Sequence, residues 1–521
     1  MLVSDIVRRN AMFFGDRDAV VVPGVETRSW ADLDLRTNRF ARALAELGVA
    51  KGARLATYAP NCSEYIDFFF ACAKSGVIGN TTNVRLAGDE IAAYLRYTEP
   101  EAILVHADLA AAASSFLADV PSLRHVIGIG DGHGFALDLE DLIAGERSDD
   151  PGMNIDETDV YQLGATSGTT GTPKGAVLTH RNAIAAISCW LAELPIAEGD
   201  TNLQNIPLFF NPGGPAGLHP VLIKGGRTVI FPRFEPGEFL RAVPEYQATH
   251  SVLVPTMVGM VLAHPECGSH DLTTLRGVIS GGSPLPRPVL ARAREVFGDV
   301  FYPLYGLAES YSCGLVLRPE CQFTEGPPEV VARLASAGKP NVLMQARVVG
   351  DDGQDVLRDA QTPGEIWLRG DTISEGYFGL PEETAASREG DWFRTADLAT
   401  VDREGFVTIV DRMKDVIITG GINVFSRDVE EVLYAHPAVL QVAVIGIPDE
   451  NWGETIHAVV VAKPDTDTDG DALLRFAAER LAAFKKPRSI EFVEALPIGG
   501  TGKILKRELR ARYWVGRERM V

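Results

Sequence analysis

Short runs of β-branched and aliphatic residues recur through the first four hundred residues, separated by stretches with helical periodicity. Glycine, proline or polar residues bound each run, which is typical of buried strands in a helix-covered sheet. Because predicted strands and helices alternate, the pattern predicts an α/β architecture with mostly parallel sheets. The clearest predicted strands lie at residues 54–59, 102–105, 228–231, 251–254 and 277–279.

One helix can be bounded from the sequence alone. Ser29 is a suitable N-cap, and Phe40, Leu44 and Leu47 follow it on one face at i, i+4 and i+7. Gly48 stands where a helix commonly ends in a left-handed residue. The sequence therefore predicts a helix that begins after Ser29 and ends before Gly48.

The pattern changes after Asp411. Short predicted strands at 442–447 and 458–462 precede an amphipathic helix, which together suffice for a small α+β domain. The charged segment 411–415 could be a hinge or a surface turn. The predicted helix carries Leu473, Phe476, Leu481 and Phe484 on its apolar face, and the predicted domains are residues 1–411 and 412–521.

Composition narrows the function classes. Of the 521 residues, 46% are hydrophobic and 23% charged, so the chain is globular and too long for a single core of roughly 250–300 residues. The formal net charge of -21 disfavours nucleic acid as a partner, since phosphate backbones are also anionic. The longest apolar stretch, near 252–263, is shorter than the ~18 residues of a spanning helix, so no transmembrane segment is expected.

Two further features favour the cytoplasm. Asp5, Arg8 and Arg9 interrupt the apolar run that a signal peptide needs, so we expect no export. The cysteines lack the paired spacing of a zinc site or a disulfide framework, which fits thiols that fill the core of a protein in a reducing compartment. They are Cys62, Cys72, Cys189, Cys267, Cys313 and Cys321.

The strongest chemical signal is a glycine- and threonine-rich segment directly after the strand-like residues 160–163. Its glycines let backbone N–H groups approach oxygen anions, its hydroxyls add donors, and Lys174 supplies positive charge. Pro173 stands where a Walker loop has its second glycine, which disfavours an ordinary kinase or GTPase. A flexible surface loop is the alternative. The residues expected to hold phosphate are Thr166, Ser167, Gly168, Thr169, Thr170, Gly171 and Lys174.

Together with four further motifs in a fixed order, this loop resembles the acyl-CoA synthetase branch of the adenylate-forming superfamily. The likeness runs from the first helix to Arg507. It implies a large domain of helix-covered, mostly parallel sheets, a small mobile α+β domain at the C-terminus, and an enzyme that joins a carboxylic acid to coenzyme A using ATP. The four motifs are Tyr305-Gly306-Leu307-Ala308-Glu309, Phe393-Arg394-Thr395-Ala396-Asp397, Asp411-Arg412-Met413-Lys414-Asp415 and Gly502-Lys503.

The resemblance implies a nucleotide site. Tyr305 is expected against adenine, and Asp397 is expected to accept hydrogen bonds from the ribose hydroxyls. Glu309 is expected to bind Mg²⁺, which prefers carboxylate and phosphate oxygens. The alternatives are a surface ion pair for Asp397 and Arg412 and a solvated charge for Glu309. Further expected nucleotide contacts are Gly281, Gly282, Ser283, Gly306, Ala308, Ile409 and Arg412, and Thr170 is a second expected metal ligand.

The resemblance also implies a catalytic lysine in the turn 499–503. Lys503 would screen the substrate carboxylate and the α-phosphate as they approach each other, with Lys174 and Glu309 as the other catalytic groups. An exposed terminal lysine is the alternative.

A second half-reaction follows, in which the thiol of coenzyme A attacks the acyl-adenylate. The resemblance implies that the small domain rotates about Lys414 and opens a tunnel for coenzyme A beside Gly420 and Gly421. Lys485 and Lys486 are candidates for the anionic end of coenzyme A, with a solvated helix terminus as the alternative.

The acyl pocket is expected between segments 209–217, 250–257 and 280–284. Residues 212–217 are unusually poor in large side chains, which favours a bulky cyclic or a medium- to long-chain acid over acetate. The alternative is that these glycines only shape a loop. The expected acyl contacts are Phe210, Asn211, Gly214, Val254 and Ser280.

Four positions depart from the family's pattern. Phe210 replaces a common histidine, Ala308 a threonine, Ala396 a glycine and Ser426 a proline. Each missing donor to the reacting phosphate could cost ~2.7–4 kcal/mol in the transition state. An alternative is therefore an enzyme that performs only the thioester half and accepts a supplied acyl-adenylate. The intact phosphate loop and Lys503 favour the complete reaction.

Other functions share these motifs. A binding protein without turnover would be expected to lack Lys503 or Glu309, and both are present. An oxidative adenylate enzyme like the beetle luciferases would keep every nucleotide motif. A carrier-loading domain is disfavoured because no carrier segment follows Val521. The expected ligands are a small carboxylic acid, ATP (or an acyl-AMP), Mg²⁺ and coenzyme A, and a homodimer stays open beside a monomer.

Overall fold

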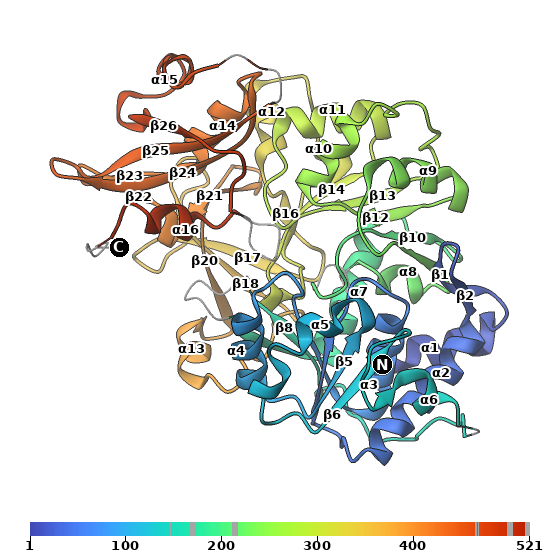
Figure 1. Ribbon diagram of the computed structural model, residues 1–521. Helices are drawn as coiled ribbons and strands as arrows, with labels where there is room; N and C mark the ends of the chain where they lie inside the picture. The colour runs from blue at the N-terminus through green and yellow to red at the C-terminus, as the bar shows by residue number, and fades with distance from the viewer. Residues whose placement is uncertain are drawn as a thin grey trace.

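The computed structural model describes residues 1–145, 147–166, 173–210, 217–463, 466, 468–497 and 504–515. Within these ranges the strands form four sheets of nine, seven, five and five strands. In Figure 1 the last of them, drawn in orange and red, forms a separate unit with its own helices beside the larger part of the chain. The prediction of helix-covered sheets followed by a smaller C-terminal domain is therefore confirmed.

The seven-stranded sheet has the order β7-β6-β5-β3-β4-β8-β9. Its strands are parallel except for the edge strand β9, which forms an antiparallel hairpin with β8 around the predicted phosphate loop. The strands are β3 (Arg54–Tyr58), β4 (Ile78–Thr81), β5 (Ala102–His106), β6 (His125–Ile129), β7 (Leu137–Asp138), β8 (Val160–Ala165) and β9 (Gly175–Thr179).

The nine-stranded sheet has the order β16-β15-β14-β13-β12-β10-β11-β1-β2. Its middle strands, from β14 to β1, are parallel, and antiparallel strands close both edges. The strands are β1 (Asp18–Val22), β2 (Glu26–Ser29), β10 (Thr201–Gln204), β11 (Arg227–Ile230), β12 (His250–Val252), β13 (Gly277–Ser280), β14 (Phe301–Tyr305), β15 (Leu315–Val316) and β16 (Lys339–Pro340).

Helices cover these two sheets, as the alternation of patterns predicts. One hydrophobic cluster joins the sheets through residues of α2, α3 and α7, and a second lies among α9, α10 and α11. The main helices are α1 (Ser4–Phe14), α2 (Trp30–Glu46), α3 (Glu64–Ser75), α4 (Gly88–Thr98), α7 (His180–Glu193), α9 (Pro236–Tyr246), α10 (Pro255–Ala263) and α11 (Arg287–Phe297). The shorter ones are α5 (Ala110–Ala113), α6 (Leu139–Ile143), α8 (His219–Leu222), α12 (Pro328–Val331) and α13 (Pro381–Ala386).

The third sheet is antiparallel and links the large part to the C-terminal unit. Its last strand, β21, leads through a single 3-10 turn, η7 (Met413–Asp415), into the first strand of the fourth sheet. The strands are β17 (Gln345–Val349), β18 (Gly364–Arg369), β19 (Arg388–Glu389), β20 (Trp392–Val401) and β21 (Val407–Arg412).

The C-terminal domain holds the fourth sheet and three helices around its own hydrophobic cluster. The sheet is antiparallel except for β26, which runs parallel to β25. Its elements are β22 (Ile417–Thr419), β23 (Ile422–Val424), α14 (Ser426–Tyr434), β24 (Val439–Asp449), β25 (Gly453–Ala462), α15 (Gly470–Ala478), β26 (Ser489–Phe492) and α16 (Lys506–Ala511).

Most local predictions hold. The helix predicted after Ser29 is α2; the Ser29 side chain accepts a hydrogen bond from the Asp32 backbone N–H, and Gly48 takes a φ of +76°. The helix predicted through Phe484 is too long, because α15 ends at Ala478 and Phe484 lies in a later 3-10 turn with 44% of its surface exposed. Leu473 is buried in the domain core. The ring of Phe484 is largely exposed, so its burial cannot stabilise a further turn of helix.

Two expectations about composition can be compared with the structure. Cys72, Cys189 and Cys313 are buried, the other three cysteines are partly buried, and all six are free thiols. None of the helices in the described ranges combines the length and hydropathy that crossing a bilayer requires.

Candidate functional site

The predicted phosphate loop is closed at its base by the β8–β9 hairpin. The Thr166 backbone N–H donates to the Lys174 carbonyl at 2.8 Å, and the Lys174 N–H donates to Oγ1 of Thr166 at 3.2 Å. The hydroxyl of Tyr97 accepts from the Gly175 N–H at 3.4 Å and donates to the Phe378 carbonyl at 2.5 Å. The base of the loop is thus fixed by backbone pairing, as a rigid anion cradle requires. The predicted Ser167, Gly168, Thr169, Thr170 and Gly171 lie outside the described residues.

Tyr377 joins two residues that the sequence predicts as catalytic. Its hydroxyl donates to Oε1 of Glu309 at 2.7 Å, and Nζ of Lys174 lies 5.1 Å from the centre of its ring. Burial raises the pKa of Tyr377, and the charge of Glu309 raises it further, so the tyrosine stays a neutral donor to an ionised carboxylate. The backbone of Glu309 is held as well, because the Ser374 N–H donates to its carbonyl at 2.7 Å.

The donor chemistry at Glu309 fits Mg²⁺. This cation is commonly held by one or two carboxylates together with phosphate oxygens of the substrate, and Glu309 lies beside the lysine at the base of the phosphate loop. Among the described residues no group of three or more histidine, cysteine or acidic side chains could hold a metal ion by itself.

Tyr305 and Asp397 are buried and form a polar cluster with the partly exposed Arg412. The Tyr305 hydroxyl donates to Oδ2 of Asp397 at 2.7 Å, and Nε of Arg412 lies 3.5 Å from Oδ1. Asp397 and Arg412 are direct partners across β20 and β21, and Tyr305 ends β14 in another sheet. Burial and the Asp397 charge raise the pKa of Tyr305. Because only 6% of Asp397 is exposed, this is not the surface ion pair considered as the alternative.

The glycines predicted beside the nucleotide lie at the ends of strands, where neighbouring atoms leave little room for a side chain. A Cβ at Gly281 would lie 2.6 Å from Cγ of Leu304, and one at Gly306 would lie 2.5 Å from the Ser312 backbone. Gly282 has a φ of +86°. These residues follow β13 and β14, at the carboxyl edge of a parallel sheet where ligands of α/β proteins commonly bind. Gly282 and Ser283 are exposed at this edge, Ile409 is partly buried in β21, and Ala308 lies in the turn that carries Glu309.

Two of the three segments predicted to form the acyl pocket, 250–257 and 280–284, meet at the same edge. β12 and β13 are paired, and a Cβ at Gly282 would lie 3.9 Å from Cγ1 of Val254. Ser280 is buried, and its Oγ has no hydrogen-bond partner among the described residues. The ring of Phe210 packs edge-on against Phe209 with centres 4.5 Å apart. The predicted Asn211 and Gly214 lie outside the described residues.

The residues predicted to hold coenzyme A lie in the C-terminal domain. Gly420 and Gly421 form the turn between β22 and β23, both with positive φ, and the Gly420 N–H donates to the Trp452 carbonyl at 2.8 Å. Trp452 is 46% exposed, and the guanidinium of Arg488 lies 5.2 Å from its ring centre. Lys485 pairs with Asp428, Lys486 is partly buried, and the predicted catalytic Lys503 lies outside the described residues.

Lys414, the predicted hinge residue, lies in the turn η7 that joins the third and fourth sheets. It is partly buried, and burial lowers its pKa.

The structure gives a conformation or a hydrogen bond to two of the residues that depart from the family's pattern, Ala396 and Ser426. Ala396 takes a φ of +58°, a left-handed conformation that explains why glycine is usual there. Ser426 begins α14, and its backbone N–H donates to Asp411 at 2.6 Å, a bond that proline cannot make.

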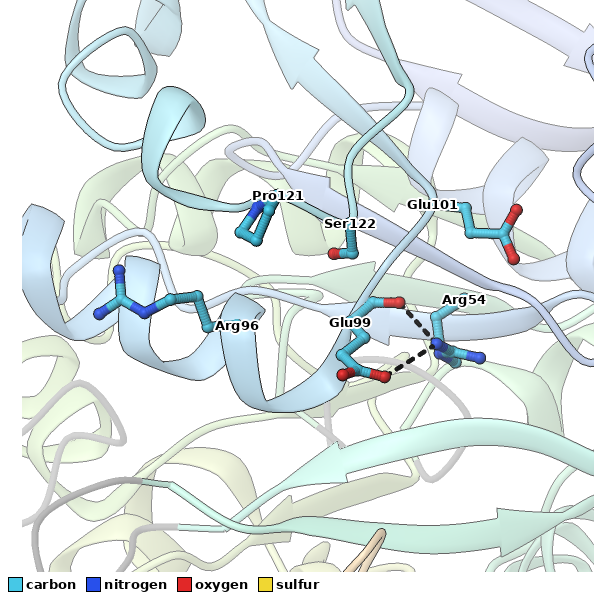
Figure 2. A pocket seen from close by; sticks show the side chains of 6 residues that line it. All are labelled: Arg54, Arg96, Glu99, Glu101, Pro121 and Ser122. Atoms are coloured by element: carbon cyan, nitrogen blue, oxygen red, sulfur yellow. Dashed lines mark hydrogen bonds and ion pairs between the residues drawn. The ribbon is translucent and has the colours of Figure 1, made fainter.

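Sequence reasoning missed Tyr377, although the structure brings it against two predicted residues. A neutral tyrosine gives no signal of charge or spacing, and Tyr377 lies in none of the motifs that carry the resemblance. The chain also has a surface hollow of about 550 Å³, which none of the predicted site residues lines (Figure 2). Arg54 and Glu99 pair across it at 3.8 Å. The other lining residues are Arg96, Glu101, Pro121 and Ser122.

Comparisons with known proteins cover both the large part and the C-terminal domain of this chain. The family model described as AMP-binding enzyme matches residues 7–378, and the model of its C-terminal domain matches residues 428–503. A feruloyl-CoA synthase of Amycolatopsis sp. is 36% identical over 93% of this chain and 94% of that protein. The long-chain-fatty-acid–CoA ligase FadD13 of Mycobacterium tuberculosis is 32% identical over 98% of both chains.

A solved structure extends the likeness to the whole fold. The anthranilate CoA ligase AuaEII, crystallised in complex with anthranoyl-AMP, is 27% identical and superposes with a TM-score of 0.89 over 98% of this chain and 97% of that chain. Both domains of this chain are therefore arranged as in a known ligase.

Proposed function

We propose that this chain, which belongs to the AMP-binding enzyme family, is an AMP-forming acyl-CoA ligase that performs both half-reactions. The observation that carries the proposal is the polar cluster of Tyr305, Asp397 and Arg412, found in the same chain as a phosphate loop whose base is anchored between two strands. The two together suit the ribose and phosphates of one nucleotide.

In the first half-reaction a carboxylate oxygen of the acid attacks the α-phosphorus of ATP. A bond forms between that oxygen and phosphorus, the bond to the bridging oxygen breaks, and pyrophosphate leaves. Asp397 accepts from the ribose hydroxyls with the oxygen capacity that Tyr305 and Arg412 leave unused. Lys174 and Lys503 supply positive charge where negative charge develops. Glu309 would hold Mg²⁺, which when bound neutralises charge on the phosphate oxygens.

In the second half-reaction the sulfur of coenzyme A attacks the acyl carbonyl, the thiol loses its proton, and AMP leaves. The proposal includes a domain boundary at residues 411 and 412 and rotation of the small domain about Lys414. Gly420, Gly421 and Lys486 are the proposed contacts for coenzyme A. The exposed ring of Trp452 beside this turn, with Arg488 against it, supports an anionic and aromatic ligand at this surface.

The proposed substrate is a bulky cyclic or a medium- to long-chain acid. Similarity to a feruloyl-CoA synthase and to a long-chain-fatty-acid–CoA ligase supports this class, as do the apolar Phe210 and Val254 beside segments of small residues. A cytoplasmic location belongs to the same proposal, since the three substrates are cytoplasmic metabolites.

Exchange of radiolabelled pyrophosphate into ATP tests the first half-reaction. With ferulate, anthranilate, palmitate and acetate as acids, we expect exchange with at least one large acid and little with acetate. Addition of coenzyme A should then yield the thioester without oxygen uptake. Thioester formation from a supplied acyl-adenylate without any exchange would favour the thioester-only alternative. Oxygen consumption without loss of coenzyme A would favour an oxidative enzyme, and binding without either would favour a binding protein.

A further inference from the structure

A buried polar cluster connects the strand that carries Arg412 to two helices of the small domain. Oδ2 of Asp411 accepts from the backbone N–H of Ser426 at 2.6 Å and from its hydroxyl at 2.8 Å. Nζ of Lys506 donates to the same hydroxyl at 2.5 Å and pairs with Glu430 at 2.7 Å. Asp411 is 8% exposed and Ser426 is completely buried, so each bond is shielded from water.

Lys506 is the positive centre of this cluster. Burial is the largest single influence on the pKa of Lys506 and lowers it. The negative charges of Glu430, Asp411 and Asp415 together outweigh burial and hold this pKa above its usual value. Asp415 has its own partner, Arg510, at 2.7 Å. Removing one member of such a buried group leaves the others uncompensated, which costs more than the pair itself contributes.

The cluster spans the proposed pivot. Asp411 precedes Lys414 and belongs to β21, where it is paired with Leu398 of β20. Ser426 and Lys506 follow the pivot and begin α14 and α16. A rotation about Lys414 would carry Ser426 away from Asp411, so the two hydrogen bonds between them can form in only one orientation of the small domain. The bonds of Lys506 to Ser426 and Glu430 lie within the small domain, where they hold the Ser426 hydroxyl in place and keep a positive charge near Asp411.

That orientation is also fixed by neighbouring contacts across the same boundary. Arg427, next to Ser426, donates to the carbonyls of Ile409 and Ala335. Arg287 of α11 pairs with Glu431 of α14 at 2.6 Å. The β22–β23 turn, which carries the proposed contacts for coenzyme A, lies on the left of the small domain in Figure 1, away from α11 and β16. We assign this arrangement to the first half-reaction.

We propose that Lys506 and Ser426 are positioning residues that lock the small domain in the orientation used for adenylation. The proposal rests on the proposed function and its pivot at Lys414. The lock depends on the residue at position 426, because its central hydrogen bond needs the N–H of Ser426, whereas a proline at this position would offer none.

Ser426→Pro is the sharpest test, because proline is well suited to the first position of a helix and should leave the fold intact. Lys506→Met removes the cation, and Lys506→Arg restores it. Lys74→Met is the matched control. Lys74 is a buried lysine of α3 that pairs with Asp34 at 2.6 Å, far along the chain from the pivot.

The two half-reactions are measured separately, as pyrophosphate exchange and as thioester formation from a supplied acyl-adenylate. We expect Ser426→Pro and Lys506→Met to lower the ratio of the first rate to the second about tenfold or more, the effect of losing hydrogen bonds to a buried charge. Lys506→Arg should restore the ratio, and Lys74→Met should lower thermal stability without changing it. Equal changes of both rates, or no change, would overturn the lock.

A second measurement does not depend on activity. Spin labels attached at the exposed positions Arg292 of α11 and Glu479 after α15 report the distance between the two domains by electron–electron double resonance. We expect one narrow distribution in the wild type and a broader one in Ser426→Pro and Lys506→Met. Identical distributions would overturn the lock even if both half-reactions were absent, whereas absent half-reactions with a changed distribution would refute only the proposed function.

Discussion

Replacing Tyr377 by phenylalanine should weaken the proposed metal site without emptying the nucleotide site. The substitution removes one hydroxyl, which donates to Oε1 of Glu309 at 2.7 Å, and keeps the ring near Lys174. A hydrogen bond to a charged group contributes about 1.5–3 kcal/mol. Because Tyr377 and Glu309 are only partly buried, the lower end of that range applies. Since each 1.4 kcal/mol is a factor of ten, the expected loss is about tenfold.

The assay is the rate of pyrophosphate exchange as a function of free Mg²⁺. We expect the concentration at half-saturation to rise about tenfold in Tyr377→Phe, as is usual when a group that orients a metal ligand is lost. The matched control is Tyr97→Phe, which removes a hydroxyl that bonds the Phe378 carbonyl but does not touch Glu309. It should lower stability and leave the Mg²⁺ dependence unchanged. Identical Mg²⁺ curves for the two variants and the wild type would refute the reasoning.

Three further predictions concern other residues of the chain. Tyr305→Phe should raise KM for ATP several-fold, because Asp397 loses its 2.7 Å donor and its orientation with it; an unchanged KM in steady-state kinetics would contradict this. Ala396→Gly should raise the free energy of unfolding by about 0.5 kcal/mol, since relief of a left-handed alanine slightly exceeds the added chain entropy of glycine, and urea unfolding measures it. Buried His180 and His250 have pKa values lowered to about 4 and about 3, mainly by burial. As the pH falls, these histidines are protonated in the unfolded chain at a higher pH than in the folded protein. The free energy of unfolding should therefore keep its full value above pH 6.5 and fall below it by up to about 1.4 kcal/mol per pH unit per histidine. Thermal unfolding measured from pH 7 to 4.5 can follow this loss.

Much of the large domain could be predicted because its signals are local. The helix α2 has a capping serine, an apolar face and a terminal glycine, and the structure shows all three. Buried parallel strands such as β5 and β13 are marked by aliphatic runs between polar residues. The error at Phe484 has the opposite origin, because the periodic pattern continues beyond Ala478 while the core that could bury it does not.

The site was less accessible to prediction, because its contacts join residues far apart in the chain. Nothing in the sequence pairs Tyr305 with Asp397 or Tyr377 with Glu309, which are separated by 92 and 68 positions. The family's pattern identified three of these residues but gave no account of Ser426, which it marked only as a missing proline. The hydrogen bonds of Ser426 to Asp411 depend on how the two domains meet, and no local pattern encodes that.

The strand β21 gives the molecule a short mechanical linkage. Arg412 touches Asp397, and Lys414 follows two positions later, at most about 7 Å along the backbone. If Lys414 is the pivot, as proposed, a ligand bound to the Asp397 carboxylate would act on the pivot through only these few residues. Swinging of the small domain would then be timed by the ligand itself, without any signal that has to cross the protein interior.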